Sequence, residues 1–179
     1  MDIASVSRTT ALSVLKHINR AESSYLKMID PFPTRRSSDL SSVPHAKGPM
    51  RELSPYEFEE FVAEVWSAQG FTTTVRQQSR DRGIDVEARQ DGVTLAIQVK
   101  QYGKGNTIGS QEVRNYATLY QQNETIDRVI IVTSAEFTTP AETLGRDLDV
   151  ELVDGTQLAE LALKYKIPIT NFVKLIESP

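Results

Sequence analysis

Two alternating segments around a tight turn constrain the fold of this chain more than any other feature. Residues 83–90 and 93–102 alternate apolar and polar side chains on either side of Asp91-Gly92, a dipeptide typical of two-residue hairpin turns. If these two residues form the turn, Gln90 faces Val93, and the pairing of every other residue follows from that one pair. The sequence therefore predicts a β-hairpin in a single register.

This register gives the hairpin two different faces. One face is uniformly apolar and pairs Ile84 with Val99, Val86 with Ile97 and Ala88 with Leu95. The opposite face pairs Asp85 with Gln98 and places Gly83 opposite Lys100. Side chains that oppose each other in this way have Cβ atoms roughly 4.5 to 5.5 Å apart. We expect this second face to be solvated and to bring an acid, an amide and an amine together, with open space at Gly83.

These residue types suit phosphodiester hydrolysis. The chain has no Cys and only two His, which excludes thiol nucleophiles and His- or Cys-rich metal sites. A hard cation such as Mg²⁺ or Mn²⁺ takes oxygen ligands, and we expect them to be the Asp85 carboxylate, the Gln98 carbonyl and the backbone carbonyl of Val99. Lys100 would orient the attacking water or neutralise developing charge.

A fourth candidate lies on the helix that precedes the hairpin. Ser54-Pro55-Tyr56-Glu57 is a capping box with Pro at the first helical position. A helical wheel places Glu57, Glu60 and Glu64 toward solvent, whereas Glu59 lies beside Trp66 at the edge of the apolar stripe. We therefore expect Glu59 alone of these four acids to face the sheet and approach Asp85.

The rest of the chain after Arg51 predicts a mixed α/β domain with the element order αβββαβαβα. A β-rich run at 71–76 precedes the hairpin, and a helix capped by Ser110 follows it. Val129-Ile130-Ile131-Val132 indicates a buried strand, Thr139 begins a second capping box, 150–153 is a short strand, and Asp154 caps the last helix. We expect this domain to span residues 51–179.

Residues 1–50 have a different character. Apolar residues between Ala11 and Ile29 are spaced as in a helix, and a Ser/Pro/Arg-rich stretch without periodicity follows Asp30-Pro31. We interpret residues 1–50 as an N-terminal helix and a poorly ordered linker. In a second interpretation, 32–40 resembles a translated sequencing adapter, and residues 1–40 then come partly from another reading frame.

Charge and hydropathy narrow the class of partner. Residues 51–179 carry 13 Lys and Arg against 20 Asp and Glu, so the domain is a poor nonspecific binder of polyanions unless a local basic strip or bound cations reverse the field. No apolar run approaches the roughly 20 residues of a membrane span, and we expect a cytoplasmic protein without membrane contact.

Several motifs together resemble a known family. Phe58-Glu59, Gly70-Phe71, Asp81-Arg82-Gly83-Ile84-Asp85-Val86, Gln98-Val99-Lys100 and Phe137-Thr138 resemble the catalytic domain of the Mrr family of restriction endonucleases, over about Leu53 to Tyr165. That family belongs to the PD-(D/E)xK nuclease superfamily, with Gln-x-Lys as its usual third motif.

The resemblance implies a fold, an activity and a site. The fold is a restriction-endonuclease-like three-layer sandwich, with a central mixed sheet between helices. The activity is divalent-metal-dependent cleavage of DNA, often of DNA carrying modified bases, with Asp85, Gln98 and Lys100 as the metal-and-water site and Glu59 as the helix acid. Mrr proteins often carry a separate DNA-binding domain, which residues 1–50 do not resemble.

DNA contacts and competing functions follow from the same motifs. Arg80, Arg82 and Lys104 could grip the phosphate backbone, or be solvated surface charges. A dimer on DNA is expected, because a domain with one site needs two copies to cut both strands. The alternatives are a module that keeps the fold and binds DNA or a partner without efficient cleavage, and a structural α/β domain whose polar hairpin face is merely wet.

The linker interpretation predicts that residues 30–50 are dispensable. A chain starting near Lys47 should unfold cooperatively at about the melting temperature of the full chain. A loss of several degrees, which corresponds to roughly 1 kcal/mol in a domain of this size, would show that the removed segment packs against the domain.

Overall fold

The computed structural model describes residues 50–76, 84–103, 105–120 and 125–168. The chain divides into two units, residues 1–38 and 39–179, and every described residue lies in the second. The expected N-terminal helix and the linker up to residue 49 lie outside the described residues. Met50 is fully buried, so the packed part of the second unit includes this residue.

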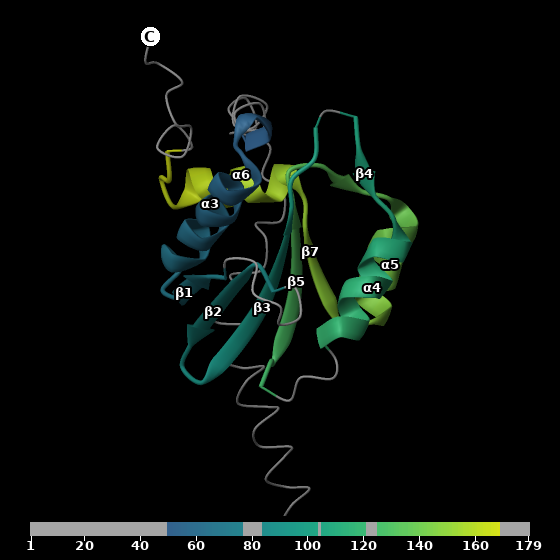
Figure 1. Ribbon diagram of the computed structural model, residues 1–179, viewed down its shortest axis with the longest axis horizontal. Helices are drawn as coiled ribbons and strands as arrows, with labels where there is room; N and C mark the ends of the chain where they lie inside the picture. The colour runs from purple at the N-terminus through teal and green to yellow at the C-terminus, as the bar shows by residue number, and fades with distance from the viewer. Residues whose placement is uncertain (1–49, 77–83, 104, 121–124, 169–179) are drawn as a thin grey trace, which may run out of the picture. The chain divides into compact units, whose positions relative to one another are not determined.

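A five-stranded mixed sheet forms the centre of this unit (Figure 1). Its strands are β1 (Thr72–Val75), β2 (Val86–Gln90), β3 (Val93–Lys100), β5 (Arg128–Thr133) and β7 (Val150–Val153), in the order β1-β2-β3-β5-β7. Strands β1, β2 and β3 pair antiparallel, whereas β3 with β5 and β5 with β7 pair parallel. The central strand β3 therefore joins an antiparallel half to a parallel half.

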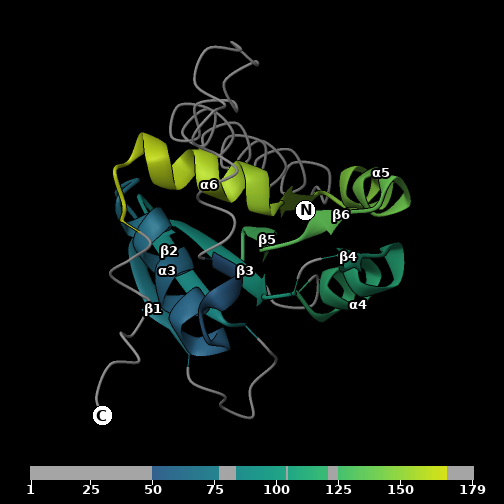
Figure 2. The same cartoon turned by 90° about the horizontal axis from the view of Figure 1, so that it is seen from above.

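Helices cover both faces of the sheet. They are α3 (Pro55–Ser67), α4 (Ser110–Tyr120), α5 (Thr139–Asp147) and α6 (Gly155–Lys164). Helix α3 packs on β1, β2 and β3 and α6 on β5, while α4 packs on β5 and α5 on β7. Helices α3 and α6 lie on one side and α4 and α5 on the other (Figures 1 and 2). The expected three-layer α/β architecture and its element order are confirmed.

One small element was not expected. Strands β4 (Thr107–Ile108) and β6 (Glu136–Phe137) form a separate two-stranded parallel sheet beside α4 and α5. Each strand has only two residues, too few for an alternating pattern to show in the sequence. Among the described residues, no helix combines the length and the apolar character needed to cross a bilayer.

The helices begin with the kinds of cap that the sequence predicts, but two of these caps lie one residue earlier than expected. Ser54 with Glu57 and Asp154 with Gln157 form the two capping boxes at α3 and α6. The cap of α5 is Thr138, not Thr139, because its hydroxyl accepts the Ala141 N–H. Ser110 is already the first residue of α4, and the Gly109 carbonyl accepts the N–H of Glu112.

The hairpin has the predicted register over its whole regular length. Val86 pairs with Ile97, Ala88 with Leu95 and Gln90 with Val93. Asp91 and Gly92 both have positive φ, 49° and 83°, as a turn that matches the right-handed twist of the strands requires.

The register expected beyond Val86 is wrong. The Asp85 N–H donates to the carbonyl of Ile97, the partner of Val86, at 3.3 Å. Two residues of one strand then face one residue of the other, as in a β-bulge. Ile84 accordingly packs with Ala96 on the α4 side instead of lying opposite Val99.

The polar face of β3 is also more covered than expected. Ala96 is fully buried and Gln98 is only 3% exposed. Tyr116 of α4 packs against Ile84 and Ala96 on this face, while α3 packs on β3 from the other side. A strand in the middle of a sheet with helices on both sides is buried throughout.

Gly155 marks a close contact that holds α6 against the sheet. Its N–H donates to the Ala135 carbonyl at 2.9 Å, and a Cβ at this position would lie 2.5 Å from the Ser134 carbonyl oxygen. We expect Gly155→Ala to lower the free energy of unfolding by about 1–3 kcal/mol, the usual effect of overpacking. Gly103→Ala is the control, because its added Cβ would have no atom closer than 4.0 Å. Equal denaturation midpoints for both variants would contradict this account.

Candidate active site

The site is built around the carboxylate of Asp85. One oxygen, Oδ2, accepts the backbone N–H of Val99 at 2.7 Å and also the side-chain amide of Gln98. The regular β2–β3 ladder ends at Val86 and Ile97, so this carboxylate bonds a strand N–H that lies beyond the ladder. The other oxygen, Oδ1, accepts no hydrogen bond from the described residues and is available to a ligand.

Lys100 lies at the end of the same strand and is held from two sides. Its Nζ lies 5.2 Å from the centre of the Tyr116 ring on α4, a cation–π contact worth about 0.5–1 kcal/mol at exposed sites. Its carbonyl accepts the Thr133 hydroxyl at 2.8 Å and the Ser134 N–H at 3.3 Å. Within the described part of the chain the ammonium makes no ion pair, so it is available to an incoming anion or water.

Glu59 is the helix acid that faces the site. The charge of Asp85 raises its pKa and that of Lys100 lowers it, while partial burial of the carboxyl gives the largest effect, upward. The charges of Asp85 and Lys100 thus act on the Glu59 carboxyl, while a direct approach of Glu59 to Asp85 stays a prediction. Glu57 instead bonds the N–H of Ser54 at 2.8 Å, and Glu64 is exposed.

Burial also raises the pKa of Asp85. The Val99 N–H, the Lys100 charge and the Gln98 amide each favour its ionised form, but the cost of removing the carboxylate from water is larger. The site therefore holds two neighbouring acids that both bind protons more readily than usual. A cation placed between them would remove this penalty.

The donor set fits a divalent cation only in part. Oxygen ligands are present at Asp85 and Glu59, and the Val99 carbonyl points to the same edge of β3 as its N–H. The Gln98 amide donates an N–H to Asp85, so its oxygen can serve as a ligand only after the amide rotates. No cluster of three or more His, Cys, Asp or Glu occurs among the residues that the structure describes. Backbone, water or substrate oxygens would have to complete the shell.

The structure thus brings Glu59, Asp85, Gln98 and Lys100 together, while their catalytic roles stay predictions. Arg80, Arg82, Gly83 and Lys104, predicted to bind DNA or to leave space, lie outside the described residues.

Two supporting features were missed by the sequence analysis. The ring of Tyr116 on α4 contacts Lys100. Tyr102 exchanges hydrogen bonds with Ser134 and donates its hydroxyl to Glu112 at 2.6 Å, which raises the pKa of Tyr102 to about 12. Helical periodicity places Tyr116 inward, but it cannot show which strand residue the ring meets.

Comparisons with known proteins concern the family and the fold of the domain. A family model described as a restriction endonuclease, Mrr_cat, matches residues 50–162. No curated protein matches the chain significantly. A solved structure described as "Protein of Unknown Function AF1548" is similar with a TM-score of 0.59 and 21% identity, over 70% of this chain and 73% of that one.

Two restriction endonucleases share the fold. The chain is similar to MspJI, solved in complex with a 27-mer oligonucleotide, with a TM-score of 0.57 and 14% identity over 76% of this chain. It is similar to the DNA modification-dependent enzyme AspBHI with a TM-score of 0.55 and 17% identity over 79% of this chain. The matches span only 36% and 41% of those two proteins. At these identities the likeness shows the fold alone.

The raised pKa of Glu59 generates a prediction about stability. A folded-state pKa above the unfolded value means that ionisation of Glu59 destabilises the fold as pH rises through that pKa. In the absence of divalent cations, we expect Glu59→Gln to raise the melting temperature at about pH 7 by a few degrees. The gain should disappear below about pH 4, where the acid is protonated in both states. Glu64→Gln, at an exposed position of the same helix, should not show this pH-dependent gain.

Proposed function

Because the chain belongs to the Mrr catalytic-domain family of restriction endonucleases, we propose that it is a divalent-metal-dependent endonuclease that hydrolyses phosphodiester bonds in duplex DNA. The observation that carries the proposal is the arrangement of Asp85 and Lys100. The carboxylate is fixed by two hydrogen bonds on one oxygen and open at the other, and an ammonium without an ion pair among the described residues lies one step along the neighbouring strand.

Each residue has a distinct part in the proposed reaction. Mg²⁺ or Mn²⁺, held by Asp85, the Val99 carbonyl and Gln98, would supply Lewis-acid activation of the phosphate and of water. Lys100 orients the attacking water and offsets the negative charge that develops on the phosphate oxygens. Glu59 adds a second oxygen ligand or accepts a proton from that water, for which a raised pKa is suited.

The proposed substrate is foreign or modified DNA, which the enzyme would meet in the cytoplasm as part of a restriction system. AspBHI, which shares the fold, is DNA modification-dependent, and MspJI was solved with an oligonucleotide. Each chain carries one such site among its described residues, so cleavage of both strands would require two copies on DNA. A homodimer formed on the substrate is therefore part of the proposal.

Plasmid cleavage tests the function directly. Supercoiled plasmid, with and without modified bases, should be nicked or linearised only when Mg²⁺ or Mn²⁺ is present. Lys100→Ala should abolish cleavage yet keep the metal-induced rise in melting temperature, whereas Asp85→Ala should lose both effects. The loss of the Tyr116 contact should cost Lys100→Ala no more than about 1 kcal/mol of stability.

A second lysine provides the matched control. Lys164 on α6 also lies over a tyrosine ring, with its Nζ 5.5 Å from the centre of Tyr165. Lys164→Ala should cut plasmid at the wild-type rate. If Lys100→Ala also cuts at the wild-type rate, the proposed mechanism is wrong. If wild type binds DNA and metal but never cuts, the chain is a binding module with the nuclease fold.

A further inference from the structure

On the side of the active site, one half of the sheet presents a polar surface on which none of the described helices packs. Glu87 and Arg89 alternate with the buried Val86 and Ala88 along β2, and Thr74, Thr72 and Thr94 pair with Glu87 and Arg89 across the register. We call it the arginine–threonine face; it consists of Thr72, Thr74, Arg76, Glu87, Arg89 and Thr94. The helices on this side, α4 and α5, pack on β5 and β7, and α3 packs on the opposite face of β1 and β2 (Figure 1).

The two arginines of this face are held by one carboxylate. Glu87 binds Arg76 through Oε2 and Arg89 through Oε1, the latter at 2.7 Å. The side chain of Glu87 is 12% exposed, whereas those of Arg76 and Arg89 are 38% and 62% exposed. A guanidinium has five N–H donors, so most of each fork remains directed outward. The cluster carries a net charge of +1 and presents its positive part to solvent.

This face continues directly into the active site. The Arg76 N–H donates to the Asp85 carbonyl at 2.8 Å, and Glu87 follows Asp85 by two positions. At 3.3 Å per strand residue, Arg89 lies about 13 Å from Asp85 along the strand. That distance is about the axial rise of four nucleotides in one strand of a DNA duplex.

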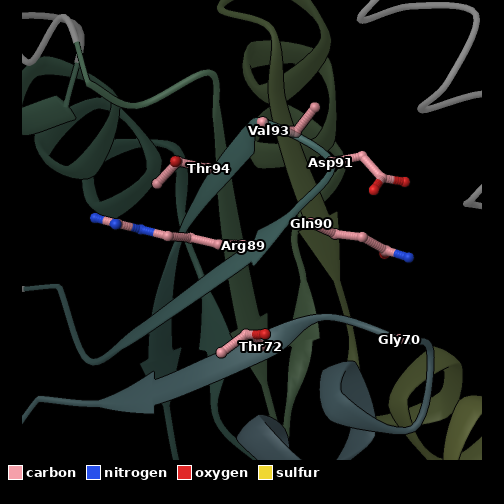
Figure 3. A pocket seen from close by; sticks show the side chains of 8 residues that line it. Gly70, Thr72, Arg89, Gln90, Asp91, Val93 and Thr94 are labelled. Atoms are coloured by element: carbon pink, nitrogen blue, oxygen red, sulfur yellow. The ribbon is translucent and has the colours of Figure 1, made fainter.

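A cavity of about 470 Å³ lies beside the hairpin turn at the far end of the face. Thr72, Arg89 and Thr94 line it together with residues outside the face, which are Gly70, Gln90, Asp91, Gly92 and Val93. Arg89 and Thr94 extend to one side of the hairpin there, while Gln90 and Asp91 extend to the other (Figure 3). Arginine and threonine are both frequent ligands of phosphate oxygens in protein–DNA complexes.

We infer that the arginine–threonine face binds the sugar–phosphate backbone of duplex DNA, with Arg76 and Arg89 contacting phosphates and Glu87 positioning both guanidinium groups. The inference rests on the proposed function. If duplex DNA is cut at Asp85, its backbone would continue from Asp85 along β2 and across this face. A domain with an excess of acids over residues 51–179 needs such a local positive surface to hold a polyanion. The competing explanation is that the charges only protect the edge strand β1 from pairing with another chain.

The salt dependence of DNA binding separates these explanations. Affinity for a labelled 20-base-pair duplex is measured by fluorescence anisotropy over a series of NaCl concentrations, without divalent ions so that no cleavage occurs. Each phosphate contact contributes about 0.9 to the slope of log K against log salt concentration. The double variant Arg76→Ala/Arg89→Ala should lower this slope by about 2 and weaken binding to all sequences alike. Arg89→Lys, which keeps the charge, should retain most of the wild-type slope.

Control variants keep the inference refutable. Arg146→Ala removes one exposed positive charge from α5 and should leave the slope unchanged. If the double variant does not fold, Arg89→Ala alone carries the test, with an expected loss of about 0.9. The inference is wrong if the arginine variants match wild type, or if they change the slope no more than Arg146→Ala does. If wild type itself neither binds nor cuts DNA, the proposed function fails instead.

Discussion

The active site depends on the carboxylate of Asp85, which replaces a backbone carbonyl of β2 as the hydrogen-bond acceptor for the Val99 N–H. Beyond Val86 the chain leaves the ladder, and the Val99 N–H would lose its partner in a buried strand, at a cost of about 1–3 kcal/mol. Oδ2 of Asp85 fills that place and holds the Gln98 amide as well. The strands can therefore separate at this point without leaving the Val99 N–H unpaired, and among the described residues the second carboxylate oxygen accepts no hydrogen bond.

The opposite edge of β3 keeps Lys100 in place while its partner strand diverges. There, parallel pairing with β5 continues to Lys100 and Thr133, and Thr133 and Ser134 bond the Lys100 carbonyl. The backbone of Lys100 is thus fixed, and the Tyr116 ring restricts its ammonium. On the acid side, burial raises the pKa of both Asp85 and Glu59, and the charge of Asp85 raises the pKa of Glu59 further. The backbone of the site is fixed, and the ionised forms of its two carboxyl groups are disfavoured. A bound cation would stabilise these ionised forms.

The parts of this fold that depend on local chemistry could be predicted from the sequence. Asp91-Gly92 set the hairpin register because both residues accept positive φ, and the caps at Ser54 and Asp154 depend on residues three positions apart. The helical wheel of α3 correctly placed Glu64 toward solvent, but Glu60, also expected there, is half-buried like Glu59. The bulge at Asp85, the burial of Gln98 and the contact of Lys100 with Tyr116 depend on how α4 packs across β3, which no local pattern encodes. Residues 77–83, where the motif continues, lie outside the described part.

The charge distribution also constrains how a polyanion could reach the site. The apolar sides of β1 and β2 are closed by α3, and α4 and α5 cover the parallel half of the other face. On the side of Gln98 and Lys100, the described helices leave the antiparallel half of the sheet free, and there Glu87 binds Arg76 and Arg89. A phosphate backbone lying along β2 would meet these two cations before it meets the carboxylates, whose repulsion is offset only by Lys100 and a bound metal. Arg76 and Arg89 would thus contribute to DNA binding, because they lie on the face that extends from the site along β2. Lys100 would contribute to cleavage, because it lies at the end of β3 beside the Asp85 carboxylate.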